Sequence, residues 1–150
     1  MIEPEEYRRH LRALLARPLF RKGSHAVNPG WIGIAERLAD AVEALPRGGT
    51  VRCSQCGEKF GFWKAYLVFD FSDGDMRDAL TGPMREAEVV SSRTCLVCGG
   101  PGEIVQVCDD LWHLALCPEH AGLPRDEISA LLRPFVEALK QGAADDGKPA

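Results

Sequence analysis

Apolar residues recur at intervals of three and four along much of the chain, a spacing typical of one buried side of a helix. It predicts helices over residues 4–17, 29–45 and 75–92, and a last helix that begins at Pro124. Pro83 and Pro134 fall inside two of these stretches, so we expect a kink or a break at each. Residues 19–27 show no clear period and are predicted to cross the surface.

Other stretches have the composition of β-strands. Residues 50–56 predict a short strand, and residues 62–71 predict a longer one that is apolar on both faces near its centre. We therefore expect the longer strand in the middle of a small sheet covered by helices. Residues 104–107 and 111–116 predict a hairpin around an Asp109–Asp110 turn. The predicted fold class is α+β, with helices packed on a small antiparallel sheet.

Two ligand pairs near the predicted hairpin indicate a metal site. Cys95-x2-Cys98 is followed at once by Gly99-Gly100, and Cys117-x2-His120 follows the hairpin. Pro118 favours a helix start directly after Cys117, which would place Cys117 and His120 on one face of its first turn. Three thiolates and one imidazole at this spacing are typical of tetrahedral zinc. A glycine-rich knuckle, a hairpin and a helix start together predict a treble-clef-like zinc module with Zn²⁺ as cofactor.

The predicted organisation follows from these elements and from the composition. The chain is expected to contain a basic N-terminal helical segment (1–28), an α/β core region (29–93), a zinc module with the C-terminal helix (94–141) and a disordered tail (142–150). The length of 150 residues fits one domain. No apolar run approaches the roughly 20 residues of a membrane span, and no signal-peptide pattern is present. Cysteines at zinc spacing fit a reducing compartment. We expect a cytoplasmic protein that makes no membrane contact.

Charge is distributed unevenly along the chain. The formal net charge of −4 argues against binding nucleic acid by bulk attraction to phosphate. Residues 1–25 are the exception, because six basic and three acidic side chains give them a net charge of +3. The basic residues are Arg8, Arg9, Arg12, Arg17, Arg21 and Lys22. A solvated helix face is the favoured interpretation, and a phosphate-binding patch is the alternative.

A second cysteine pair, Cys53 and Cys56, leaves several interpretations open. The pair could hold a second zinc ion, with Cys108 and His113 as the completing donors. Alternatively, both could be packing residues, because positions i and i+3 of a strand face opposite sides. A third arrangement joins the pair to Cys95 and Cys98 in one all-cysteine site. We favour a single zinc ion held by Cys95, Cys98, Cys117 and His120. His10 and His25 have no neighbouring spacing that suggests a metal site.

The chain resembles a group of small, mostly uncharacterised bacterial and phage proteins over about ninety of the 150 residues. Three features match: Gly30-Trp31 at a helix start, residues 55–61, and the terminal Cys-x2-Cys…Cys-x2-His module. Residues 55–61 correspond to the Gln-x-Lys-Glu-Lys-Phe-Gly signature of that group, with Gly57 in place of its first lysine. In those proteins positions 53 and 56 are usually aliphatic, which favours the single-zinc interpretation. The resemblance implies the fold and the zinc site, without an established activity.

Four protein donors would close the zinc site, so a structural role is favoured and no enzyme activity is expected. We expect a non-catalytic, zinc-stabilised binding protein that acts on a protein partner with a basic surface. An inhibitor, immunity or anti-defence protein of bacterial or phage origin would fit. The alternative is a nucleic-acid-binding zinc-finger protein that uses the basic N-terminal segment. A treble-clef nuclease centred on His113 is less favoured, because the paired His-His and Asn-x8-His arrangements of such enzymes are missing.

Overall fold

The computed structural model describes residues 1–107 and 112–145, with residues 142–145 described by their backbone alone. The α-helices are α1 (Pro4–Leu15), α2 (Ile32–Glu43), α3 (Gly74–Ser92), α4 (Pro118–Ala121) and α5 (Arg125–Asp145). Single 3₁₀ turns are η1 (Pro18–Phe20), η2 (Pro29–Trp31) and η3 (Gly48–Thr50). None of the described helices combines the length and the apolar character that crossing a membrane requires.

Two small sheets complete the fold. The first contains β1 (Ser24–His25), β2 (Arg52–Lys59) and β3 (Phe62–Val68) in that order, with β1 parallel to β2 and β3 antiparallel to β2. The second is the antiparallel hairpin of β4 (Glu103–Val107) and β5 (Trp112–Leu116). The predicted α+β class is confirmed. The predicted Asp109–Asp110 turn lies outside the described residues.

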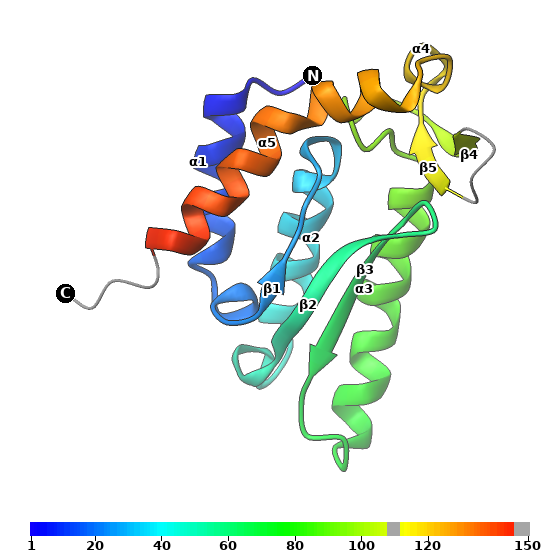
Figure 1. Cartoon of the computed structure of the whole chain (residues 1–150). Helices are drawn as coiled ribbons and strands as arrows, with labels where there is room; N and C mark the ends of the chain where they lie inside the picture. The colour runs from blue at the N-terminus through cyan, green and yellow to red at the C-terminus, as the bar shows by residue number, and fades with distance from the viewer. Residues whose placement is uncertain (108–111, 146–150) are drawn as a thin grey trace.

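The helices cover one face of the three-stranded sheet (Figure 1). Figure 1 shows α2 and α3 behind β2 and β3, while α5 lies along α1 at one side of the molecule. Tyr7 of α1 donates a hydrogen bond of 2.6 Å to the Val27 carbonyl, and its ring meets Phe135 of α5 edge-on at 5.1 Å between centroids. The basic N-terminal helix therefore packs on the core.

The segment after α1 is buried only in part. The predicted surface crossing at 19–27 holds for residues 21–24 and Ala26, which are exposed, and is wrong for the two ends of the segment. Leu19, Phe20 and Val27 are almost fully buried. Between them, His25 pairs with Cys56 as β1 joins the edge of β2. The segment contributes to the core through Leu19 and Phe20 of a 3₁₀ turn and through Val27, which follows a very short strand. Neither element is long enough to produce a period in the sequence.

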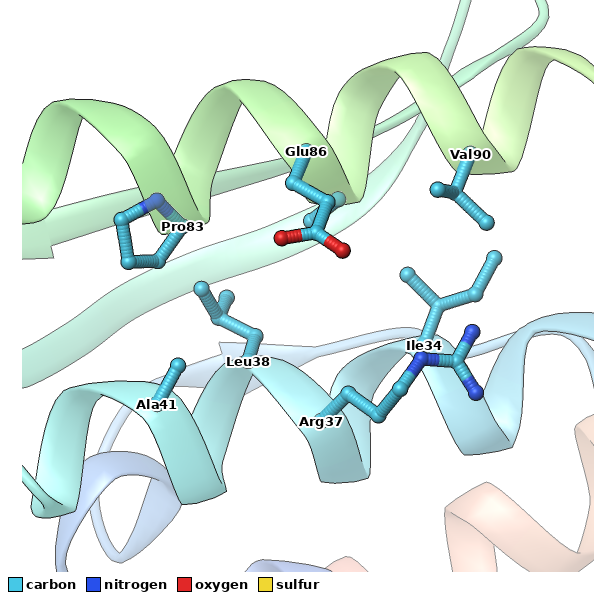
Figure 2. Close-up of a pocket in the computed structure, with 8 residues that line it drawn as sticks. Ile34, Arg37, Leu38, Ala41, Pro83, Glu86 and Val90 are labelled. Atoms are coloured by element: carbon cyan, nitrogen blue, oxygen red, sulfur yellow. The ribbon is translucent and has the colours of Figure 1, made fainter.

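Prolines do not interrupt the helices in which they lie, although a break was one of the predicted outcomes. α3 continues through Pro83 and α5 continues through Pro134. Figure 2 shows the Pro83 ring directed toward Leu38 of α2, so the proline packs between the two helices. The hollow beside it holds about 40 Å³, far below the roughly 300 Å³ of a small-molecule site. α5 also extends through residues 142–145 of the predicted tail, and residues 146–150 lie outside the described residues.

Strand β3 lies at the edge of its sheet, and not in the middle as its composition predicts. Trp63 and Leu67 are buried on the helix-covered side. Tyr66 and Val68 alternate with them and are each 49% exposed. The strand is therefore apolar on both faces while the described residues cover only one of them.

Ser91 of α3 joins this helix to the start of β3. Its hydroxyl accepts a 2.9 Å hydrogen bond from the buried Trp63 backbone N–H and donates one of 2.8 Å to the Glu88 carbonyl. The Ser91 side chain and the Trp63 N–H lie in the interior, where an unpaired N–H is costly.

We expect Ser91→Ala to lower the free energy of unfolding by about 1–3 kcal/mol, because the Trp63 N–H loses its acceptor. Ser92→Ala is the matched control, since the Ser92 hydroxyl bonds to the carbonyl of its own helix at Val89, and it should change stability by less than about 0.5 kcal/mol. Urea denaturation of both variants measures the difference. Equal stability of the two variants would contradict this role for Ser91.

Candidate metal centre

The structure brings together the predicted ligands Cys95, Cys98, Cys117 and His120. Their ligand atoms all lie within 4.8 Å of one another. Cys95 and Cys98 follow α3, Cys117 follows β5, and His120 lies in α4. Cys98 is half-buried and the other three are buried. This compact cluster could hold a metal ion.

The distances within the cluster fit a tetrahedral ion. The Cys98 and Cys117 sulfurs are 3.8 Å apart, and His120 Nδ1 lies 3.4 Å from Cys95 Sγ and 3.1 Å from Cys117 Sγ. Metal–sulfur bonds of about 2.3 Å and metal–nitrogen bonds of about 2.0 Å require S–S edges of about 3.8 Å and S–N edges of about 3.5 Å. Small side-chain movements would therefore suffice to coordinate an ion.

A tight backbone turn positions the first two ligands. The Gly99 N–H donates to the Cys95 carbonyl at 2.8 Å, and the Cys95 N–H donates to the Gly100 carbonyl at 2.8 Å. Gly99 has a φ of +77°, which favours glycine. The Gly100 N–H points at Cys98 Sγ over 3.4 Å and would stabilise a thiolate there. The sequence Cys-x2-Cys-Gly-Gly thus folds into the predicted knuckle.

The second ligand pair is placed by a helix start. Cys117 is the N-cap residue of α4, and Pro118 occupies its first position, as predicted. The His120 N–H donates to the Cys117 carbonyl at 3.1 Å. This single turn directs Cys117 Sγ and His120 Nδ1 to the same point, opposite the knuckle.

Gly30 and Trp31 hold the knuckle against the core. The Gly30 N–H donates to the Leu96 carbonyl at 2.8 Å, and Trp31 Nε1 donates to the Thr94 carbonyl at 2.8 Å. A Cβ atom on Gly30 would overlap the Cys95 carbonyl and come within 2.6 Å of the Gly99 nitrogen. Only glycine permits this approach, so the Gly-Trp helix start and the knuckle form one packed unit.

Burial also affects the acidity of the ligands. Desolvation raises the pKa of the Cys95 thiol to about 11, because a buried thiolate loses its hydration. At neutral pH this thiol keeps its proton when no cation is present. An ion bound here would take the place of that proton, so binding would release protons.

Cys53 and Cys56 face the same side of the sheet, so the prediction that they face opposite sides is wrong. A β-bulge between Cys53 and Gln55 inserts Ser54 as an extra residue in β2. The bulge shifts the alternation by one position, so both cysteines are buried. They form a cluster separate from Cys95 and Cys98, which excludes the alternative all-cysteine arrangement.

Among the described residues, the third member of this cluster is His25, and not His113 as in the alternative with a second zinc ion. The His25 ligand atom lies within 4.8 Å of both sulfurs. His113 pairs with Gln106 in the second hairpin and lines a shallow cleft with Trp112, and Cys108 lies outside the described residues. Sequence reasoning missed His25 because it is brought to Cys56 by parallel strand pairing, which leaves no local spacing signal.

Part of the basic N-terminal segment is neutralised by ion pairs. Arg17 contacts both Asp40 and Glu43 of α2 at 2.7 Å, and these carboxylates raise the pKa of its guanidinium, Glu43 having the larger effect. Arg8 pairs with Glu5 at 2.8 Å. Arg9 lies 3.9 Å from Glu6, so three of the predicted phosphate-binding residues already have acidic partners.

No protein family, curated protein or solved structure in the comparisons matches this chain. The resemblance to bacterial and phage proteins stays a prediction. The function must therefore be inferred from the geometry of the described residues.

The Gly30 contact gives a direct test of the link between the core and the metal centre. We expect Gly30→Ala to lower the free energy of unfolding by about 2–4 kcal/mol, because backbone atoms must move apart. It should also weaken metal binding, measured by competition with a chromophoric chelator.

Gly33→Ala is the matched control. Gly33 lies in α2, and a Cβ atom there would meet only the end of Arg37 at 3.6 Å. Alanine should raise helix stability by about 0.5–1 kcal/mol and leave metal affinity unchanged. If both variants bind metal as the wild type does, the Gly30 contact does not position the knuckle.

Proposed function

We propose that this protein is a non-catalytic, zinc-stabilised binding protein that acts through contact with a protein partner. The observation that carries the proposal is the exposed apolar face of β3. Supporting it are the closed metal cluster, which suits a structural ion, and the acidic residues beside the exposed face. The proposal extends to a cytoplasmic location, as a reducing compartment keeps the ligand thiols available.

Zinc is the ion that best suits the buried cluster. Three sulfurs and one imidazole nitrogen form a donor set that zinc binds tetrahedrally in structural sites. Four protein donors leave no position for a reacting water. Hairpin β4–β5 has only two strands, and a two-stranded hairpin is marginally stable alone. The ion would therefore supply folding free energy to this module.

Removing one ligand tests the zinc assignment. We expect protein purified without added metal to contain zinc, and Cys117→Ser to contain one zinc ion fewer per chain. Glu119→Gln changes an exposed residue between the two ligands and should keep the wild-type content. Elemental analysis measures both. Another metal in the purified protein, or unchanged zinc in Cys117→Ser, would contradict the assignment.

The partner surface is the outer face of β3. Tyr66 and Val68 lie on it, and Phe60 at the β2–β3 turn is 74% exposed. Phe60 adopts a φ of 53°, and the Glu58 carboxylate accepts a 2.7 Å hydrogen bond from the Gly61 N–H beside it. A non-glycine residue rarely adopts this conformation. The turn thus holds a large aromatic side chain in solvent at a cost in backbone strain, which favours a role in contact.

The charges beside this face indicate the chemistry of the partner. Asp70 follows β3 and Asp75 lies in the first turn of α3, and both are exposed. Hydrogen bonds from Ser72 lower the pKa of Asp70, which keeps it ionised. An aromatic face bordered by carboxylates suits a protein with apolar and basic residues. A nucleic-acid-handling protein that is inhibited through its basic surface would be one such partner.

Polar substitutions on β3 test this function. We expect Tyr66→Thr/Val68→Thr to reduce recovery of the partner at least about tenfold in quantitative affinity purification, while threonine maintains the strand. Val136→Thr alters a similarly exposed apolar residue on α5 and should recover the partner as the wild type does. The purified partner should then bind the protein directly, and more weakly as salt concentration rises.

Two results would contradict the proposed function. One is a set of bound proteins that is the same for all three forms of the protein. The other is retardation of labelled DNA or RNA at physiological salt, which would favour the nucleic-acid-binding alternative.

A further inference from the structure

A second group of metal-ligand side chains lies on the buried side of the three-stranded sheet. His25 comes from β1, and Cys53 and Cys56 come from β2. The His25 Nδ1 atom is 3.7 Å from Cys56 Sγ, close to the S–N edge of about 3.5 Å expected around a tetrahedral ion. The cysteines are buried and His25 is half-buried.

The His25 ring is oriented for coordination. Its Nε2 lies 3.2 Å from the Lys22 carbonyl oxygen, which can only accept a hydrogen bond, so Nε2 carries the proton of the neutral ring. Nδ1 then presents its lone pair to the two sulfurs. Histidines that bind metals commonly donate their second N–H to a backbone carbonyl in this way. His120 also directs Nδ1 at its cysteines.

The surrounding residues fix this arrangement. Phe20 packs edge-on against the His25 ring, with centroids 5.2 Å apart. Gly23 has a φ of +130°, and a Cβ atom there would lie 2.5 Å from the Ser54 carbonyl oxygen and 2.9 Å from His25 Cε1. Glycine at this position therefore allows residues 22–25 to approach the bulge of β2. The same bulge turns Cys53 and Cys56 inward.

We propose that His25, Cys53 and Cys56 form a second metal site, which binds a thiolate-preferring divalent ion such as zinc. Among the described residues the site has three protein donors, and an ion held by these three would have one coordination position left for a small exogenous ligand. It differs in this respect from the cluster of Cys95, Cys98, Cys117 and His120, whose four donors close the coordination sphere. With one protein donor fewer, the second site binds its ion more weakly and exchanges it faster.

A hydrogen-bonded thiol pair supports this chemistry. Hydrogen bonding from Cys56, together with His25, lowers the pKa of the Cys53 thiol to about 6, while the same pairing and burial raise the pKa of Cys56. A cation bound between the two sulfurs displaces their protons.

Metal stoichiometry tests the proposal. The full chain is purified with reductant, stripped of metal and refilled separately with Zn²⁺ or Co²⁺. We expect two ions per chain. Added chelator should first remove the ion bound by His25, Cys53 and Cys56, and the cobalt–thiolate absorption should grow in two steps as the sites fill. Cys53→Ser/Cys56→Ser should bind a single ion.

Histidine variants keep the test decisive if the double variant fails to fold. His25→Gln removes only the half-buried donor. It should lower the affinity for the second ion at least tenfold and leave the affinity for the first ion unchanged. His113→Gln is the control and should retain both ions at wild-type affinity. Saturation of the refilled wild-type protein at one equivalent would overturn the proposal. So would loss of the second ion in His113→Gln, or a Cys53–Cys56 disulfide that persists in reductant.

Discussion

A backbone contact too close for any side chain joins the metal centre to the rest of the molecule. Gly30 lies against the Cys95 knuckle, and the adjacent Trp31 is buried and bonded to the Thr94 carbonyl. The start of α2 and the knuckle therefore cannot move independently. An ion bound at the knuckle would therefore also restrict α2, which contributes a large part of the apolar core. An ion in this cluster would thus stabilise the whole fold and not the hairpin alone.

Local patterns in the sequence predicted the parts of the structure that local physics determines. The spacing of apolar residues located α1, α2, α3 and α5 because a helix buries one side at a fixed period. The Cys-x2-Cys-Gly-Gly and Cys-Pro-x-His segments predicted the first cluster because each folds into a single turn that needs no distant partner. Pro83 and Pro134 show the limit of the rule that proline breaks a helix. At Pro83, packing against α2 can maintain a helix that loses one hydrogen bond.

The second cluster depends on contacts that no local pattern records. Three features create it: a parallel pairing of two residues of β1 with β2, a one-residue bulge at Ser54, and a glycine that lets the two segments meet. Each depends on tertiary packing. The position of β3 was mispredicted for a related reason. A strand covered by helices on both faces and an edge strand with one exposed apolar face have the same pattern of apolar residues.

The edge-on contact of Tyr7 with Phe135 has a consequence for the order in which the chain folds. α1 is synthesised before every other described helix, whereas its partner α5 comes after all the described strands and the last metal ligand. During synthesis, therefore, the part of α1 that α5 covers stays exposed while more than half of the chain is added. The contact between Tyr7 and Phe135 can therefore form only late in synthesis, after every described strand has been made.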